Sequence, residues 1–207
     1  AMEPSEYGII AVVNAFAALL APFIALKLSG AIPRYFFEYQ GEALREYIST
    51  MLFTAIAVSV LLAGAVWGAG DALTGLLFPK AQIAFFPFFI IAVASMVLRE
   101  IALIAERLLL TQERGGALLQ RHLLATPAAI AFGFWFVAGN GWGAAGALGA
   151  TACTNALSLL LSLWMVRRAL VWRWRFGLLW PSLRYAIPLI PFSLGGYLFL
   201  FSDRVVM

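Results

Sequence analysis

The chain has 207 residues, of which 63% are hydrophobic and only 12% charged, with a formal net charge of +4 and a mean hydropathy of +0.93. A soluble domain is roughly half apolar and about a quarter charged, so a soluble fold of this composition would expose large apolar patches to water. The composition therefore excludes an ordinary soluble domain. It indicates an integral membrane protein with room for about six or seven spans of ~20 residues.

Six apolar segments follow one another along the chain. Each has the apolar length of a helix and lacks the alternation over roughly ten residues that marks a barrel strand. They cover residues 7–28, 48–70, 81–110, 123–139, 144–166 and 185–207. We therefore predict an all-α fold, a polytopic bundle of about six transmembrane helices.

The basic residues are distributed unevenly between alternate breaks. Eleven of them lie in or beside the breaks after the first, third and fifth segments, and the opposite side holds Lys80 alone. The eleven are Lys27, Arg34, Arg45, Arg107, Arg114, Arg121, Arg167, Arg168, Arg173, Arg175 and Arg184. Because Lys and Arg favour the cytoplasmic side, we predict that these breaks are cytoplasmic and that the N-terminus faces outside.

The first break carries Arg34 and Glu38, four residues apart after Pro33. This spacing allows the two side chains to pair on one helical turn. Arg34 is either a cation for a phosphate at the cytoplasmic mouth or an anchor that sets the orientation of the helix. Further along, Glu42, Arg45 and Glu46 are predicted to lie in a solvated first turn.

The third segment carries charges within its apolar length. Arg99 is followed by eleven mainly apolar residues and would lie ~15 Å from the end of the helix. At 100° per residue, six charged side chains share roughly 140° of one helix face: Arg99, Glu100, Glu106, Arg107, Glu113 and Arg114. Charges at depth face a bundle interior or a watery cavity, so this stripe either lines a transport path or decorates a part of the helix that protrudes into the cytoplasm.

The basic aromatic stretch "RRALVWRWRFGLLW" follows the fifth segment. Tryptophan rings at headgroup level and guanidinium groups on lipid phosphates suit a segment in the cytoplasmic interface. Interleaved Arg and aromatic residues also occur in nucleic-acid binding, but the adjacent spans argue against a nucleic-acid partner.

The last segment contains Pro188, Pro191, Gly195 and Gly196, and near its end the charged pair Asp203 and Arg204. Each proline removes a helical hydrogen bond, and each glycine weakens the helix. We expect a bend between about residues 184 and 196 that acts as a hinge, with the charged pair facing the bundle interior.

Residues typical of catalytic sites are scarce. The chain has one histidine and one cysteine, and no metal-ligand cluster, catalytic triad or glycine-rich phosphate loop occurs in the sequence. We therefore expect no enzymatic activity, no metal and no cofactor.

Three stretches resemble polysaccharide exporters of the multidrug/oligosaccharidyl-lipid/polysaccharide superfamily, and most closely Wzx-type flippases for lipid-linked O-antigen. They are "EPSEYGIIAVVNAF", "AIPRYFFEY" and "LRYAIPLIPFSLGGYLFLFSDRVVM". The resemblance implies two lobes of about six helices each, of which this chain would supply helices two to seven. Residues 1–166 would then be an incomplete first lobe, 167–182 an interfacial linker and 183–207 the first helix of the second lobe. The chain would be a fragment, with a native six-helix protein as the alternative.

The resemblance further implies that the protein flips a polyprenyl-diphosphate-linked oligosaccharide across the bacterial cytoplasmic (inner) membrane by alternating access. Its partners would be this substrate, membrane lipids and other polysaccharide-assembly proteins. A diphosphate needs cations where it crosses, and arginine binds phosphate bidentately, so the candidates are Arg34, Arg99, Arg107 and Arg204.

Ion coupling would rest on Glu100, Glu106 or Asp203, and Asp203 would also orient Arg204. A cation-coupled exporter of small drugs, and an inactive fragment or membrane scaffold, are the alternatives.

Overall fold

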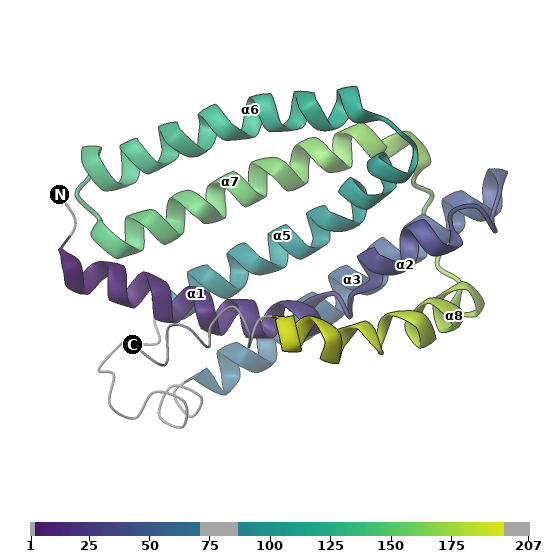
Figure 1. The fold of residues 1–207 in the computed structure, drawn as a ribbon, viewed down its shortest axis with the longest axis horizontal. Helices are drawn as coiled ribbons and strands as arrows, with labels where there is room; N and C mark the ends of the chain where they lie inside the picture. Colours follow the sequence, from purple (N-terminus) through teal and green to yellow (C-terminus); the bar gives the residue numbers. More distant parts are fainter. Residues whose placement is uncertain (1–2, 71–86, 197–207) are drawn as a thin grey trace.

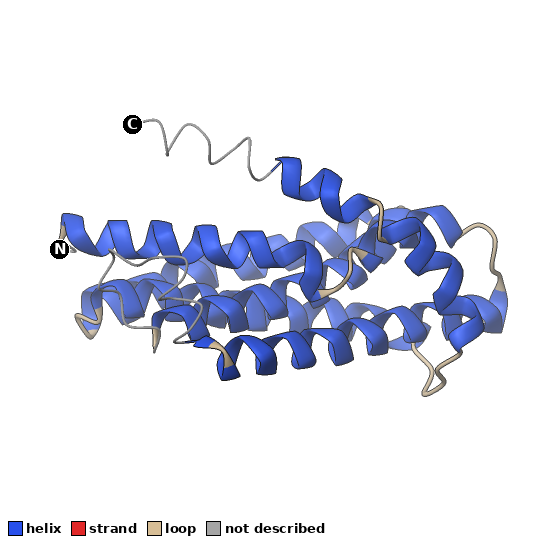
Figure 2. Cartoon of the chain, turned by 90° about the horizontal axis from the view of Figure 1, so that it is seen from below, coloured by secondary structure: helices blue, strands red, loops and turns tan. Residues whose placement is uncertain are grey.

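A computed structural model of the chain describes residues 3–70 and 87–196. Within these ranges every regular element is helical (Figure 2), which confirms the predicted all-α class. The elements are α1 (Pro4–Ile24), α2 (Leu28–Tyr35), α3 (Gly41–Gly68), α5 (Phe88–Thr111), α6 (Gly115–Gly133), the π-helical turn η1 (Phe134–Gly139), α7 (Gly143–Val166), the 3₁₀ turn η2 (Arg167–Ala169) and α8 (Phe176–Ala186).

Five helical segments are long and apolar enough to cross a membrane, and they make this a multi-pass membrane protein. Their mean hydropathy lies between 1.4 and 2.2. They are Ser5–Ile24, Gly41–Gly68, Phe88–Thr111, Gly115–Gly139 and Gly143–Ala169. These correspond to the first five predicted segments, while the sixth continues beyond the described residues.

Helix α5 is the centre of the bundle and packs against α1, α2, α3, α6 and α7. Its most extensive partner is α7 (Figure 1). Helix α7 also buries Ala144, Gly146 and Ala150, and Gly146 lies close to the Phe136 carbonyl of η1. Small residues of this kind let helix backbones approach closely in a membrane. Helix α6 lies on the outside, packed mainly on α7, and most of its surface is exposed.

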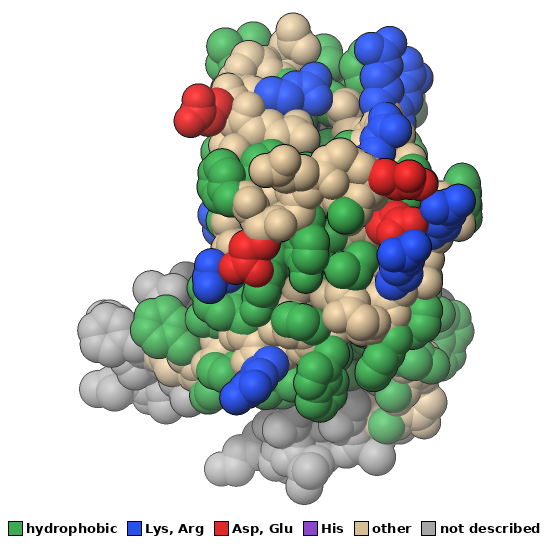
Figure 3. Space-filling model, turned by 90° about the vertical axis from the view of Figure 1, so that its right-hand side faces the viewer, with side chains coloured by type: hydrophobic (Ala, Val, Ile, Leu, Met, Phe, Trp, Pro, Cys, Tyr) green, Lys and Arg blue, Asp and Glu red, His purple; other side chains and the backbone are tan. Residues whose placement is uncertain are grey.

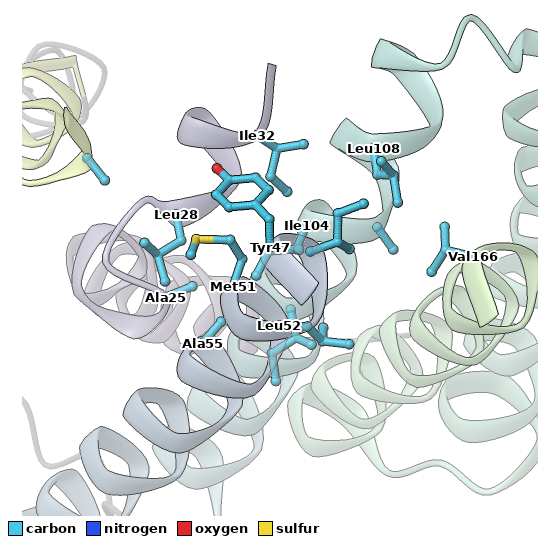
Figure 4. Packing of buried hydrophobic residues seen from close by; sticks show 14 of the residues in the cluster. Ala25, Leu28, Ile32, Tyr47, Met51, Leu52, Ala55, Ile104, Leu108 and Val166 are labelled. Carbon is cyan, nitrogen blue, oxygen red and sulfur yellow. The ribbon is translucent and has the colours of Figure 1, made fainter. Parts of the chain in front are cut away.

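Two apolar clusters hold the helices together, one toward each end. The cluster near the start of α3 surrounds Tyr47, which is fully buried among Ile32, Met51 and Ile104 (Figure 4). The Tyr47 hydroxyl donates to the carbonyl of Ala31 and accepts from Ser182 Oγ, both at 3.2 Å. A buried hydroxyl without partners would be costly, so this chain of bonds ties α2, α3 and α8 together.

The first apolar segment is broken into α1 and α2, which the sequence analysis did not predict. Leu26 and Lys27 both take left-handed backbone conformations, with φ of 48° and 52°. Such conformations are strained for residues other than glycine. The Ser59 hydroxyl donates to the Ile24 carbonyl at 2.9 Å, so α3 satisfies an acceptor at the break.

The ends of the helices separate the chain into two sides, as predicted. The end of α2, the start of α3, the α5–α6 turn and the end of α7 lie together on the right in Figure 1. Lys and Arg side chains, drawn in blue, gather over this end (Figure 3), and we call it the basic end. The N-terminus and the α6–α7 turn lie at the other end. That the basic end faces the cytoplasm remains a prediction.

The stretch after η2 lies along the first turns of α3. The Val171 amide donates to Ser49 Oγ at 2.8 Å, and the Arg175 amide donates to Thr50 Oγ1 at 3.2 Å. Helix α8 begins at Phe176, within the segment 167–182 that was predicted to be a linker. The linker is therefore attached along its length to α3.

Glu46 corrects the prediction of a solvated first turn. It is 3% exposed because two linker arginines close over its carboxylate. Arg173 Nη1 lies 3.1 Å from Oε1 and Arg175 Nε lies 3.1 Å from Oε2. Glu42, by contrast, is exposed, and it also pairs with Arg173 at 2.8 Å.

Helix α8 stops at a turn formed by Ile187 and Pro188, and helix resumes over residues 189–196. This interruption lies inside the stretch where the sequence predicts a bend. That this interruption acts as a hinge remains a prediction. Asp203 and Arg204 lie outside the described residues.

Candidate functional site

A polar pocket of about 270 Å³ lies between α5, α6 and α7, in the half of the bundle toward the basic end. Helix α5 contributes Arg99 and Glu106, α6 contributes Arg121, and α7 contributes Asn155 and Ser158. All three helices are among the five that can span a membrane. Polar side chains at such positions are the usual marks of a substrate or ion path.

An ion pair between Glu106 and Arg121 forms one wall of this pocket. Arg121 Nη2 lies 3.0 Å from Glu106 Oε2, and the side chains are only 22% (Glu106) and 9% (Arg121) exposed. Glu106 lies five residues before the end of α5 and Arg121 six residues after the start of α6, so an antiparallel hairpin brings them near each other. Arg121 was assigned to the cytoplasmic flank from its sequence position; the structure instead buries it in the bundle.

Arg121 retains hydrogen-bonding capacity after these contacts. Its Nη1 donates to Ser162 Oγ at a long 3.5 Å, and its Nη2 lies 3.3 Å from His122 Nε2. Its buried Nε has no hydrogen-bond partner among the described residues. Buried polar atoms are normally paired, so this N–H is a candidate donor to a ligand or a water molecule.

Arg99 gives the pocket a net positive charge. Its side chain is exposed and makes no ion pair within the described ranges. The pocket therefore holds two guanidinium groups for the single carboxylate of Glu106. Arg99 lies about 18 Å along α5 from its end at Thr111, slightly deeper than the ~15 Å that the sequence predicted.

Asn155 fixes the opposite wall. Its Nδ2 donates to Ser95 Oγ at 2.8 Å and to the Ser95 carbonyl at 3.2 Å, which joins α7 to α5. The amide oxygen of Asn155 and the hydroxyl of Ser158 are uncharged groups that suit sugar hydroxyls. Arg121, Asn155 and Ser158 were all missed in the sequence; only the similar spacing of Glu106 and Arg121 about the turn indicated a contact.

The predicted charged stripe on α5 is split, which corrects the single polar face expected from its helical angles. Glu100 does not line the pocket; it is 3% exposed and packed in the core. Its Oε2 has no hydrogen-bond partner in the described part of the chain, although the charges of Lys27 and Arg99 act on it. Arg107 is exposed and also lies outside the pocket. An angular range of 140° is wide enough to include both a packed side and an open side.

Arg34 pairs with Glu38 at 2.9 Å, as the four-residue spacing predicted. Both side chains are well exposed. Arg34 also lines a cleft of about 450 Å³ between α2 and α8, together with Tyr35, Trp180, Pro181, Arg184 and Tyr185. The cleft combines two cations with three aromatic rings, but it is separate from the pocket of Arg99.

The predicted hinge residues lie apart from both cavities. Pro188 is in the turn that ends α8, and Pro191, Gly195 and Gly196 lie in the helical stretch after it, all four exposed. No cluster of three or more His, Cys, Asp or Glu side chains occurs among the described residues.

Comparison with known protein families, with curated proteins and with solved structures finds no match to this chain. The resemblance to polysaccharide exporters therefore rests on the three sequence stretches alone.

Proposed function

We propose that this protein moves a lipid with an anionic, sugar-bearing headgroup across the membrane, and that the headgroup belongs to the polyprenyl-diphosphate-linked oligosaccharides of bacterial envelope synthesis. The observation that carries the proposal is the pocket with two arginines and one glutamate inside membrane-spanning helices. Such a pocket suits an anion that must leave water while its lipid tail stays in the bilayer.

The chemistry of the pocket matches a sugar diphosphate. Guanidinium groups bind phosphate oxygens through paired N–H donors, and Arg99 and the Nε of Arg121 have donors to offer. Asn155 and Ser158 would contact hydroxyl groups of the first sugar. At about 270 Å³ the pocket is small for a whole headgroup, so we expect the lightly packed α6 to move away from α7 when the substrate enters.

The Glu106–Arg121 pair suggests how binding and release alternate. A diphosphate that engages Arg121 competes with Glu106 for the same guanidinium group. Glu106 then loses its partner in a poorly solvated site, where a lone carboxylate is unfavourable. Release of the substrate restores the pair, so the pair would open and close once in each transport cycle.

A cation-coupled exporter of small molecules is the second candidate, and Glu100 favours it. This carboxyl is buried beside the break between α1 and α2 and has an oxygen without a described partner. Broken helices with unpaired polar groups are where many transporters bind their coupling ions.

Reconstitution of the full gene product into vesicles tests the proposal directly. A fluorescent polyprenyl-diphosphate oligosaccharide should become accessible to a reagent on the opposite side, whereas a fluorescent phosphatidylcholine should not. Transport of a cationic dye without movement of the lipid would favour the second candidate. Absence of both activities in folded, reconstituted protein would contradict both.

A further inference from the structure

A larger cleft, of about 790 Å³, opens at the basic end between the start of α3, the α5–α6 turn and the end of α7. Four arginines line it and no carboxylate does: Arg45, Arg114, Arg167 and Arg168. We call it the basic cleft. The amides of Gln112 and Gln120 are its other polar side chains. It shares no residue with the pocket that holds Arg99.

These four arginines have no counter-charge, whereas four other arginines at this end have one. Arg34, Arg121, Arg173 and Arg175 each pair with a glutamate. The arginines of the basic cleft make no ion pair within residues 3–70 and 87–196. Four unneutralised cations around one cavity repel one another, and an anion in the cleft would relieve that repulsion.

Contacts to main-chain carbonyls and to a ring fix three of these side chains. Arg45 Nη2 donates to the Arg168 carbonyl, and Arg114 Nη1 donates to the Met165 carbonyl at 3.5 Å. The Arg167 guanidinium lies 5.1 Å from the centre of the Trp164 ring. A guanidinium group carries five N–H donors, so most of them stay free in the cleft.

Apolar side chains continue from the cleft toward the middle of the membrane. Leu124 follows Gln120 by four residues on α6, and Leu160 precedes Trp164 by four residues on α7, so each lies on the same helix face one turn away. Leu124 is 56% exposed and Leu160 is 65% exposed. A soluble anion would not need this surface, whereas the acyl chains of a lipid would cover it.

We propose that the basic cleft binds the phosphate headgroup of an anionic membrane lipid, with its acyl chains lying along α6 and α7. Basic pockets between transmembrane helices on the cytoplasmic side are suited to such headgroups. The bound lipid would connect the α5–α6 turn with the end of α7 and so stabilise the hairpin that carries Arg121. The site does not depend on the proposed transport function.

Arg168→Gln is the most direct test, because the Arg168 side chain makes no hydrogen bond or ion pair with the described residues and only its charge is removed. Arg107→Gln is the matched control, since the Arg107 side chain is also exposed, has no such bond in the described part of the chain and lies outside the cleft. Binding of short-chain phosphatidylglycerol, short-chain phosphatidylcholine and inorganic pyrophosphate to the full gene product in neutral detergent is measured by thermophoresis.

The proposal predicts that phosphatidylglycerol binds and phosphatidylcholine does not. Arg168→Gln should weaken that binding by about tenfold, while Arg107→Gln changes it less than about twofold. An equal loss in both variants would mean general surface attraction and would overturn the site. Pyrophosphate binding as tight as that of phosphatidylglycerol would assign the cleft to a free anion instead of a lipid. Phosphatidylglycerol binding that is unchanged in Arg168→Gln would also refute the proposed lipid site.

Discussion

At the scale of single residues, one member of the Glu106–Arg121 pair could be predicted from the sequence and the other could not. Arg99 and Glu106 could be singled out because charges in an apolar run are rare. Arg121 could not, because a cation near a turn is usually an anchor for orientation. Only the packing of α5 on α6 and α7 decides that it is buried and paired.

Arg121→Met and Glu106→Gln test how strongly the pair is coupled. Glu106→Gln leaves a buried guanidinium without a counter-charge, which we expect to cost about 3 kcal/mol. For a chain of this size, that corresponds to a decrease of roughly 6–12 °C in the midpoint of thermal unfolding in detergent. The double variant should be more stable than the sum of the two single effects predicts. Simple additivity would mean that the two side chains do not depend on each other.

At the scale of elements, the position of the linker was predictable but its attachment was not. The composition of "RRALVWRWRF" indicated an interfacial segment, whereas the contacts of Ser49, Thr50 and Glu46 join parts of the chain that are far apart in sequence. The break between α1 and α2 could not be predicted for a similar reason. Its strained backbone is supported by the hydrogen bond from Ser59 on α3, and no local sequence pattern indicates that contact.

Ser49→Ala should release the linker locally. The Val171 amide loses its acceptor, a loss of about 1 kcal/mol, and its hydrogen exchange should become about fivefold faster. Ser59→Ala is the control, because Ser59 is also a buried serine on α3 but bonds to Ile24. Unchanged exchange at Val171 in Ser49→Ala would show that the ion pairs of Glu46 hold the linker without this bond.

Replacing Pro188 and Pro191 by alanine should make α8 continuous with the helical stretch 189–196. Spin labels on cysteines replacing Leu178 and Ser193, in a Cys153→Ala background, would then show one narrow distance near ~22 Å. The parent chain should show a different or broader distribution. Pro181→Ala is expected to leave the break in place. If the double variant keeps the parent distribution, packing and not proline causes the break.

At the scale of the whole molecule, five of the six predicted apolar segments correspond to spans that the structure describes, and the alternating basic breaks predicted which helix ends lie together. Those features depend on composition and on the thickness of a membrane, so they could be predicted from sequence alone. The basic cleft and the polar pocket could not, since each is formed by side chains from three or more elements.

Labelling with a membrane-impermeant maleimide checks the predicted orientation. In a Cys153→Ala background, Ser5→Cys should react in intact cells, and Glu113→Cys should react only after permeabilisation. The reverse pattern would place the basic end outside and contradict the positive-inside assignment.

The transport rate of Arg99→Gln, compared with that of Arg107→Gln in the same vesicles, tests the central claim most directly. Both changes remove one charge from an exposed arginine on α5, and only Arg99 lines the polar pocket. We predict that Arg99→Gln slows translocation of the diphosphate-linked lipid by at least about tenfold at unchanged protein abundance, while Arg107→Gln stays within about twofold of the parent protein. Equal rates for the two variants would contradict a role for the pocket in carrying the headgroup.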